Sequence, residues 1–196
     1  MVCLHQNIST PSRSPRFSSS RIKKILKKET YSPYRIAKHS SDFIGGVLEF
    51  ISFEVLDLAV NNAVVCNKTT ISPLNIRLAI HGDSELNDLF GRVAYSELNI
   101  ESYDKYILIV IGELYPSFRI SSIGMKLLNT FLNDIVKCIM IEAHHICTTV
   151  RGKRTLQIRD MSDSIGMLFT GRIRDTAIWE GTRCVLYKRL QQKIRF

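Results

Sequence analysis

Three carboxylates, Glu49, Glu54 and Asp57, stand in the otherwise apolar stretch GGVLEFISFEVLDL of a 196-residue chain whose formal net charge is +9. Carboxylates can act as general acids and bases, hold a cation or bind arginine. At 100° per residue these three fall at about 0°, 140° and 80°, largely opposite the apolar side of the same helix. No Ser/His/Asp or paired-carboxylate pattern accompanies them, so the sequence predicts neither an enzyme nor a cofactor, and it predicts that the three acids face away from the core. A merely solvated acidic face is the alternative.

Lysine and arginine are unevenly distributed along the chain. Residues 1–28 hold seven of them and no acid, residues 29–100 hold five against nine acids, and residues 101–196 hold fifteen against nine. Two basic regions therefore flank an acidic middle, which predicts a polyanionic partner and a separate acidic surface. For each single basic residue, a solvated surface charge is the alternative.

Cysteine, histidine and apolar residues limit other kinds of site. The five cysteines show no CxxC spacing, which predicts reduced thiols rather than disulfides or a zinc site. His144 and His145 are adjacent on a predicted helix, 100° apart, and are poorly placed to share a metal. The N-terminus lacks the apolar segment of a secretory signal, and the longest apolar run, residues 106–111, is too short to span a membrane. We expect an intracellular protein.

The elements that must position these residues are helices. Residues 1–20 are rich in Ser, Pro and Arg, which predicts a disordered tail, with order beginning near residues 17–21. From Ser41 to about Cys66, apolar residues recur at steps of three and four, which predicts one long helix with Ser40 or Ser41 as its N-cap. A short helix precedes it in RIKKILKKE. Another follows in LNIRLAIHG, with Ser72 as N-cap and Pro73 at its first position.

The second half repeats this order of short, long and short helices. Its expected segments lie within residues 103–114, from Met125 to Ala143 and in RDMSDSIGML, and the loop dipeptides at 70–71 and 155–156 occupy matching places. The run ILIVI conflicts with the repeat, because its β-branched residues taken alone predict a strand. Only the repeat favours a helix there.

A unit whose long helix exposes an apolar stripe cannot bury that stripe alone. We therefore predict an all-α fold in which the two halves pack long helix across long helix, so that one chain supplies both halves of a pseudo-heterodimer. Trp179, the single tryptophan, belongs to no motif and is expected to be a packing residue or a surface contact.

Both halves resemble core histones. The first half is similar to histone two-A in VLEFISFEVLDLAVNNAVVCNKTTISPLNIRLAIHGDSELNDLFGRV, and in FSSSRIKKILKKETYSPYRI with one residue inserted. The second half resembles histone two-B in ESYDKYILIVIGELYPSFRISSIGMKLLNTFLNDI, KRTLQIRDMSDSI and AIWEGTRCVLYK. The resemblance covers about residues 17–189, and a single chain that joins the two in this order is similar to the histone doublets of giant DNA viruses. It implies two tandem histone folds packed as an intramolecular handshake.

The resemblance implies DNA contacts to phosphates and the minor groove, without base readout. Arg35 matches a minor-groove arginine, whereas another loop arginine of the family is Thr70 here. The implied DNA-binding residues are Arg21, Lys24, Lys27, Lys28, Arg35, Lys68, Ile120, Ser121, Ser122, Lys153, Arg154 and Thr155.

The resemblance also implies an acidic patch that anchors arginine-bearing peptides. Its members are Glu49, Glu54, Asp57, Asp83, Glu85 and Glu180. Two positions depart from the family, because Ser84 replaces one acid and Arg172 reverses the charge of another. We therefore expect a weakened patch with altered partner choice.

Taken together, these implications predict a histone doublet that packages double-stranded DNA into nucleosome-like particles with a partner of the histone three and histone four type, itself separate or fused. Its expected parts are a basic tail (1–16), a two-A-like fold (17–93), a linker (94–102) and a two-B-like fold with a C-terminal helix (103–196). It would act in chromatin, in a nucleus or viral factory, and in the virion if viral. The rivals are a histone-fold module for protein interaction or transcription, and a virion DNA condenser that forms no discrete particles.

Overall fold

The computed structural model describes residues 17–29, 35–92 and 102–194, and these are mostly helical, as the sequence predicts. The predicted tail at 1–16 and nearly all of the linker at 94–102 lie outside the described residues. Within the described part, no helix is both long and apolar enough to cross a lipid bilayer.

The first half runs from α1 to α4. Helix α1 (Ser19–Glu29) leads through β1 (Arg35–Ile36) to the long helix α2 (Ser40–Val65), and β2 (Thr70–Ile71) leads to α3 (Pro73–Gly82) and α4 (Ser84–Arg92). The predicted start of α3 is confirmed, because the Ser72 hydroxyl accepts a hydrogen bond from the Asn75 amide and the Asn75 side chain accepts one in return from the Ser72 amide.

The second half repeats the order and adds a long terminal helix. Its elements are α5 (Asp104–Leu114), β3 (Arg119–Ile120), α6 (Ser122–His145), the short π-helix η1 (Ile146–Val150), β4 (Thr155–Leu156), α7 (Ile158–Leu168) and α8 (Gly171–Ile194). The run ILIVI lies inside α5, so the strand that its β-branched residues predict is wrong and the repeat is the better guide. Burial explains this outcome, because Ile107, Val110 and Ile111 lie in the core at helical spacing.

The predicted N-cap of α2 is wrong. His39 holds that position in a left-handed conformation (φ 67°) and makes no side-chain cap, while Ser40 is fully buried in the first turn. Asp42 organises this end instead: its carboxylate contacts the His39 ring at 3.0 Å and accepts a hydrogen bond from the Ser19 hydroxyl. A carboxylate in the first turn also compensates the positive end of the helix dipole.

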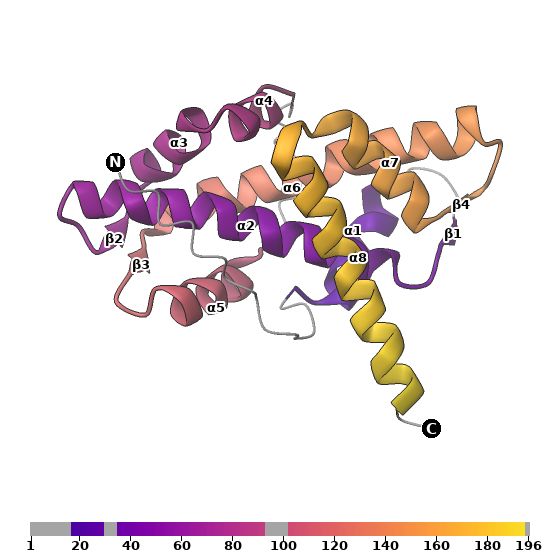
Figure 1. Ribbon diagram of the computed structural model, residues 1–196, viewed down its shortest axis with the longest axis horizontal. Helices are drawn as coiled ribbons and strands as arrows, with labels where there is room; N and C mark the ends of the chain where they lie inside the picture. The colour runs from indigo at the N-terminus through magenta and orange to yellow at the C-terminus, as the bar shows by residue number, and fades with distance from the viewer. Residues whose placement is uncertain (1–16, 30–34, 93–101, 195–196) are drawn as a thin grey trace.

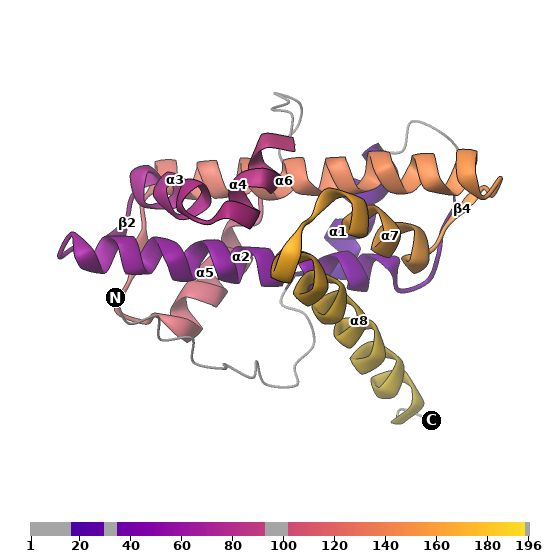
Figure 2. The ribbon, with the colours of Figure 1, turned by 45° about the horizontal axis from the view of Figure 1, so that its top comes forward.

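The two long helices run antiparallel, and short parallel strand pairs join their ends (Figures 1 and 2). Strand β1 precedes α2 and pairs with β4, which follows α6, whereas β2 follows α2 and pairs with β3, which precedes α6. Each end of the molecule therefore combines a loop from the first half with a loop from the second half.

One hydrophobic core joins the two halves. It contains apolar side chains of α1, α2 and α3 together with those of α5, α6, α7 and α8. Phe17 is buried against Tyr103 and Tyr106 of the second half, with ring centroids 5.4 and 5.2 Å apart. Neither half could keep this apolar surface from water alone, so the halves stabilise each other.

Buried asparagines of α6 hold the start of α5 in place. The Asn129 side chain accepts a hydrogen bond from the Tyr103 amide at 2.7 Å and donates one to Asp104. Asn133 in turn donates to the Asn129 carbonyl at 2.8 Å. These buried polar groups are satisfied within the second half, and they account physically for two asparagines of the stretch LLNTFLND.

Candidate nucleic-acid interface and acidic surface

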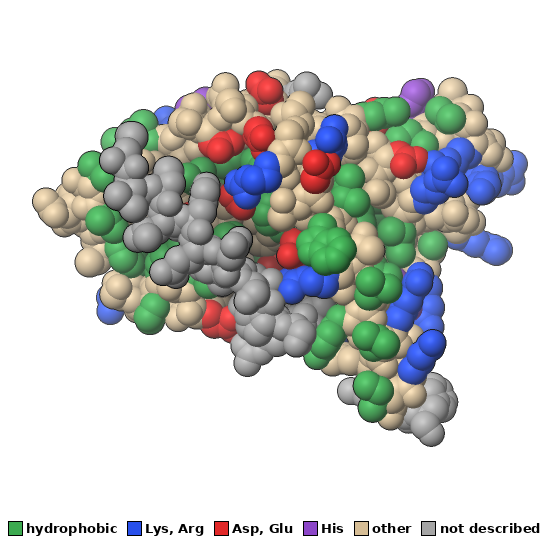
Figure 3. Space-filling model, viewed as in Figure 1, with side chains coloured by type: hydrophobic (Ala, Val, Ile, Leu, Met, Phe, Trp, Pro, Cys, Tyr) green, Lys and Arg blue, Asp and Glu red, His purple; other side chains and the backbone are tan. Residues whose placement is uncertain are grey.

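One end of the molecule, where β1 pairs with β4, gathers three exposed cations. The Arg35 amide donates to the Arg154 carbonyl at 3.1 Å, and the Ala37 amide donates to the Leu156 carbonyl at 2.9 Å. The side chains of Arg35, Lys153 and Arg154 are all exposed, although they come from loops about 120 residues apart in the chain. Figure 3 shows Lys and Arg side chains gathered at this end, which we call the first loop pair. Clustered exposed cations of this kind attract a polyanion.

Ion pairs that were not predicted hold the loop before β4. The Arg151 guanidinium pairs with Asp160 and Asp163 of α7. Asp160, which is buried, also accepts a hydrogen bond from the Gln157 amide at 2.7 Å and so caps α7. Arg151 and Asp160 therefore fix the position from which Lys153 and Arg154 project. The sequence does not reveal this role of Arg151, because its partners lie beyond β4, in α7.

The other end, where β2 pairs with β3, holds a cation that the sequence reasoning missed. Arg119 lies directly opposite Thr70 in the parallel register, and its amide donates to the Thr69 carbonyl at 2.9 Å. Its side chain is exposed. An exposed arginine from the second half of the chain therefore lies beside Thr70 of the first half. No local pattern in the sequence reveals this pairing, because it depends on how the two loops align.

The second loop pair, as we call this end, also presents the start of α6. Ser121 is the N-cap, and its hydroxyl accepts a hydrogen bond from the Gly124 amide at 3.1 Å. Lys68 and Ser122 are exposed beside it, and Ile120 is half-buried. A long-helix N-terminus beside exposed cations is a suitable place for a phosphate.

Helix α1 contributes a row of basic residues. Arg21, Lys24 and Lys27 are exposed, whereas the side chain of Lys28 lies outside the described residues. Arg21 is partly engaged, because its guanidinium donates to the Ser102 carbonyl at 2.6 Å.

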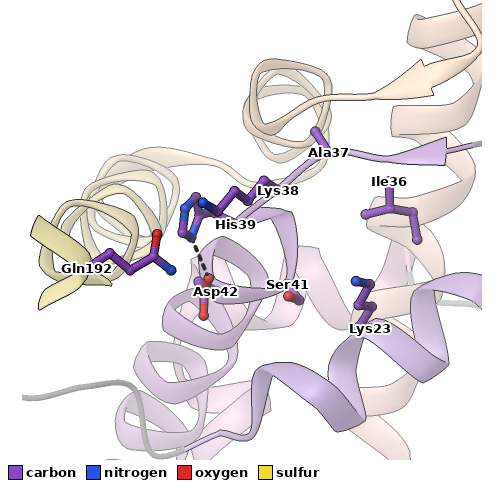
Figure 4. A pocket seen from close by; sticks show the side chains of 8 residues that line it. All are labelled: Lys23, Ile36, Ala37, Lys38, His39, Ser41, Asp42 and Gln192. Atoms are coloured by element: carbon purple, nitrogen blue, oxygen red, sulfur yellow. Dashed lines mark hydrogen bonds and ion pairs between the residues drawn. The ribbon is translucent and has the colours of Figure 1, made fainter. Parts of the chain in front are cut away.

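A shallow hollow lies between α1 and the start of α2, close to the first loop pair (Figure 4). Lys23 and Lys38 line it, together with His39 and Asp42, and Gln192 of α8 closes one side. The Asp42 carboxylate is already engaged by His39 and Ser19. The ammonium groups of Lys23 and Lys38 therefore keep their positive character, and they extend the basic surface from the first loop pair to α1.

The acidic surface contains an arginine at its centre. Arg172 donates from two guanidinium nitrogens to the two oxygens of Glu54 at 3.2 and 3.1 Å. This hydrogen bond to Glu54, with the nearby charges of Glu85 and Asp83, raises the pKa of Arg172 above its ordinary value despite partial burial. Arg172, the charge reversal noted in the sequence, therefore pairs with Glu54, one of the predicted acids.

The other predicted acids also interact within the chain. The Glu85 carboxylate accepts hydrogen bonds from the amides of Arg172 and Ile173 at 2.9 and 2.7 Å, and these bonds cap the start of α8. Gly171, the first residue of α8, has a φ of +54°, and a side chain there would overlap the Glu85 carboxylate. Asp83 accepts the Leu86 amide at 2.9 Å and Glu180 pairs with Arg183.

Asp57 and Glu49 occupy separate surroundings on α2. The Tyr115 hydroxyl donates to Asp57, and burial together with this contact raises the pKa of Tyr115 well above its usual range. Glu49 lies near Cys184 and Glu180 of α8, where burial and these charges raise the pKa of the thiol to about 12. The structure thus brings Glu54, Asp83 and Glu85 together around Arg172, places Glu49 and Glu180 each near Cys184, and leaves Asp57 on Tyr115.

Replacing Arg172 by alanine is expected to increase the affinity for an arginine-bearing peptide about tenfold. The change exposes both Glu54 oxygens, and a charge-assisted hydrogen-bond pair of this kind is worth roughly 1.5–3 kcal/mol. Fluorescence anisotropy with a labelled peptide, and with the same peptide carrying alanine for arginine, measures this. Arg174→Ala, which removes an arginine paired with Asp175 on the same helix, should leave the affinity unchanged. Equal affinities of Arg172→Ala and the parent chain would show that Arg172 does not compete with a peptide arginine for Glu54.

Metal-binding groups and disulfides were sought among the described residues. Across residues 17–29, 35–92 and 102–194, no group of three or more His, Cys, Asp and Glu side chains could hold a metal ion. Four cysteines are described, all as free thiols. No model of a known protein family matches the chain.

Proposed function

We propose that this protein is a histone doublet that packages double-stranded DNA without reading its sequence, in nucleosome-like particles with a histone three and histone four type partner. In this proposal each half is a histone fold, and the antiparallel packing of α2 and α6 is the handshake between them. The proposal rests on the sequence resemblance together with one structural observation. Two loop pairs, each built from both halves and each carrying exposed cations, lie at opposite ends of the long helices.

This arrangement suits the phosphate backbone of a duplex. The first loop pair offers Arg35, Lys153 and Arg154, and the second offers Lys68, Arg119 and the amide end of α6. Helix α1 adds the exposed Arg21, Lys24 and Lys27. Contacts of this kind position a protein on DNA through charge and helix N-termini, and they carry no base information. Bending of the duplex between two such sites is therefore the expected product.

The affinity for DNA is expected to fall steeply with salt. Each neutralised phosphate contributes a slope of about −0.9 to log K against log[salt] on duplex DNA, so four or more contacts predict a slope of about −4 or steeper. Fluorescence anisotropy with two unrelated duplexes of equal length measures both the slope and the sequence preference. A salt-insensitive complex, or strong discrimination between the duplexes, would contradict the proposal.

The second candidate is a histone-fold module that binds proteins rather than DNA. The acidic surface favours it, because Glu54, Asp83 and Glu85 gather around a single arginine. Such a module does not need cations at both loop pairs, so the salt experiment separates the two: a protein-binding module would show weak, shallow DNA binding. A virion condenser that forms no particles would give the same slope and is separated by nuclease digestion.

A further inference from the structure

The outer side of α8 carries an apolar stripe that no other described element covers. Trp179, Leu186, Leu190 and Ile194 are 65%, 51%, 58% and 83% exposed. On a helical wheel they fall within an arc of about 80°, and they extend over roughly 22 Å of helix. None of the described residues of α8 beyond Val185 is buried, and Figures 1 and 2 both show this end extending away from the rest of the molecule. A continuous exposed apolar stripe indicates a binding surface.

The charges along α8 differ at its two ends. From Gly181 to Ile194 the helix carries Arg183, Lys188, Arg189 and Lys193 and no acid. On either side of Trp179, towards the start of the helix, acids outnumber bases. Arg172, Arg174 and Arg183 pair with Glu54, Asp175 and Glu180. Three further carboxylates lie close by, Glu49 near Cys184 and Asp83 and Glu85 near Arg172. Figure 3 shows hydrophobic side chains along α8 with Lys and Arg beside them towards its C-terminal end.

These charges select among possible occupants of the stripe. An anionic lipid surface would suit the basic end but would be repelled by the acids around Trp179. A parallel second copy would place the two basic ends together, and their like charges would repel each other. An antiparallel second copy places the basic end of each α8 against the acidic surroundings of the other copy's Trp179. In this arrangement the two apolar stripes are in contact along their whole length.

We propose that the outer stripe of α8 is a self-association surface, which pairs two copies of this chain through antiparallel α8 helices related by a two-fold axis. The same patch then serves both copies, so the contact closes on itself and forms a dimer rather than a filament. Four apolar side chains a copy are far fewer than the 20–30 residues a side of a standard interface. The dissociation constant is therefore expected to be on the order of 0.1 mM. Copies arrayed close together would still pair, because a high local concentration compensates for a weak contact.

The single tryptophan makes this surface directly observable. The full chain is studied without DNA by sedimentation velocity and tryptophan emission, from about 5 µM to about 500 µM, a range that brackets the expected constant. A rise from monomer to dimer accompanied by a blue shift of Trp179 emission is expected. Raising the salt should weaken the dimer, because it screens the pairing of basic and acidic ends. A chain that stays monomeric throughout would overturn the proposal, and a dimer strengthened by salt would overturn the antiparallel arrangement.

Two double variants with matched chemistry assign the surface. Leu186→Gln with Leu190→Gln should abolish both the dimer and the blue shift, while far-UV circular dichroism remains that of the parent chain because both side chains are exposed. Leu74→Gln with Leu78→Gln, an exposed leucine pair at the same spacing on α3, should leave the dimer intact. The reverse pattern would place the contact on α3. A third outcome would assign the stripe to lipid instead. In that outcome, Trp179 emission of the protein at 5 µM shifts to the blue when vesicles containing phosphatidylserine are added, and without vesicles it does not change with protein concentration.

Discussion

Replacing Arg35 and Arg154 together by alanine is expected to lower the affinity for duplex DNA by on the order of a hundredfold at moderate salt. The two residues meet in the first loop pair, where the Arg35 amide donates to the Arg154 carbonyl, and their exposed side chains project from adjacent backbone. Each charge-assisted contact to a phosphate is worth roughly 1.5–3 kcal/mol, and 1.4 kcal/mol is a factor of ten. The change leaves the backbone pairing of β1 with β4 intact, so the fold should be unaffected.

The salt dependence gives this variant a second, independent readout. Losing two phosphate contacts should make the slope of log K against log[salt] shallower by about 1.8. Lys105→Ala with Arg174→Ala removes the same charge from an exposed and a half-buried position outside both loop pairs, so it controls for net charge. If the control pair weakened binding as much as Arg35→Ala with Arg154→Ala, binding would depend on total charge rather than on the loop pair.

Replacing Gly46 by alanine is expected to destabilise the fold by about 2–3 kcal/mol, in the range measured for overpacked cores. Helix α2 crosses α8 closely at this residue: a Cβ there would lie 2.7 Å from the Glu180 carbonyl oxygen, 2.8 Å from the Cys184 Sγ and 3.0 Å from the Gly181 Cα. Two of these three atoms belong to the backbone and cannot turn away. Chemical denaturation followed by circular dichroism measures the loss.

A matched glycine gives an effect of opposite sign. Gly166 lies inside α7 with nothing within 4 Å of its Cβ position, so Gly166→Ala should stabilise the fold by about 0.5–1 kcal/mol through helix propensity. Cys184 supplies a local readout, because it is buried with a pKa of about 12 in the parent chain and should react with thiol reagents faster in Gly46→Ala. Equal stabilities of the two variants would mean that α8 does not cross α2 at Gly46.

Periodicity and capping rules predicted most of the helices, because those signals are local. The bounds of α3 follow from Ser72, Pro73 and Gly82, and the long helices follow from apolar residues at steps of three and four. The run ILIVI shows the limit of local signals, since its β-branched residues favour a strand and burial in a helical core overrides them. The start of α2 also escaped prediction, because Asp42 acts through His39 and Ser19, and Ser19 is remote in sequence.

Pairings between the two halves were the hardest features to predict from the sequence. The opposition of Arg119 and Thr70 depends on the register of β2 with β3, which no local pattern determines. The acids of GGVLEFISFEVLDL were predicted to form one patch with Asp83, Glu85 and Glu180, weakened by Arg172 and Ser84. In the structure Glu54 pairs with Arg172, Asp57 with Tyr115, and Glu49 lies near Cys184. A sequence shows that Arg172 is present, but only the crossing of α2 by α8 shows that its guanidinium reaches Glu54.

Micrococcal nuclease digestion of a reconstitution tests the packaging proposal most directly. The full chain is combined with a histone three and histone four type pair on a long DNA of mixed sequence and digested over a time course. The account predicts a protected fragment of defined length that persists as digestion proceeds, and that Arg35→Ala with Arg154→Ala shortens or destabilises. A continuous smear with the parent chain would contradict nucleosome-like packaging and favour a condenser, and digestion at the rate of free DNA would contradict every DNA-binding proposal.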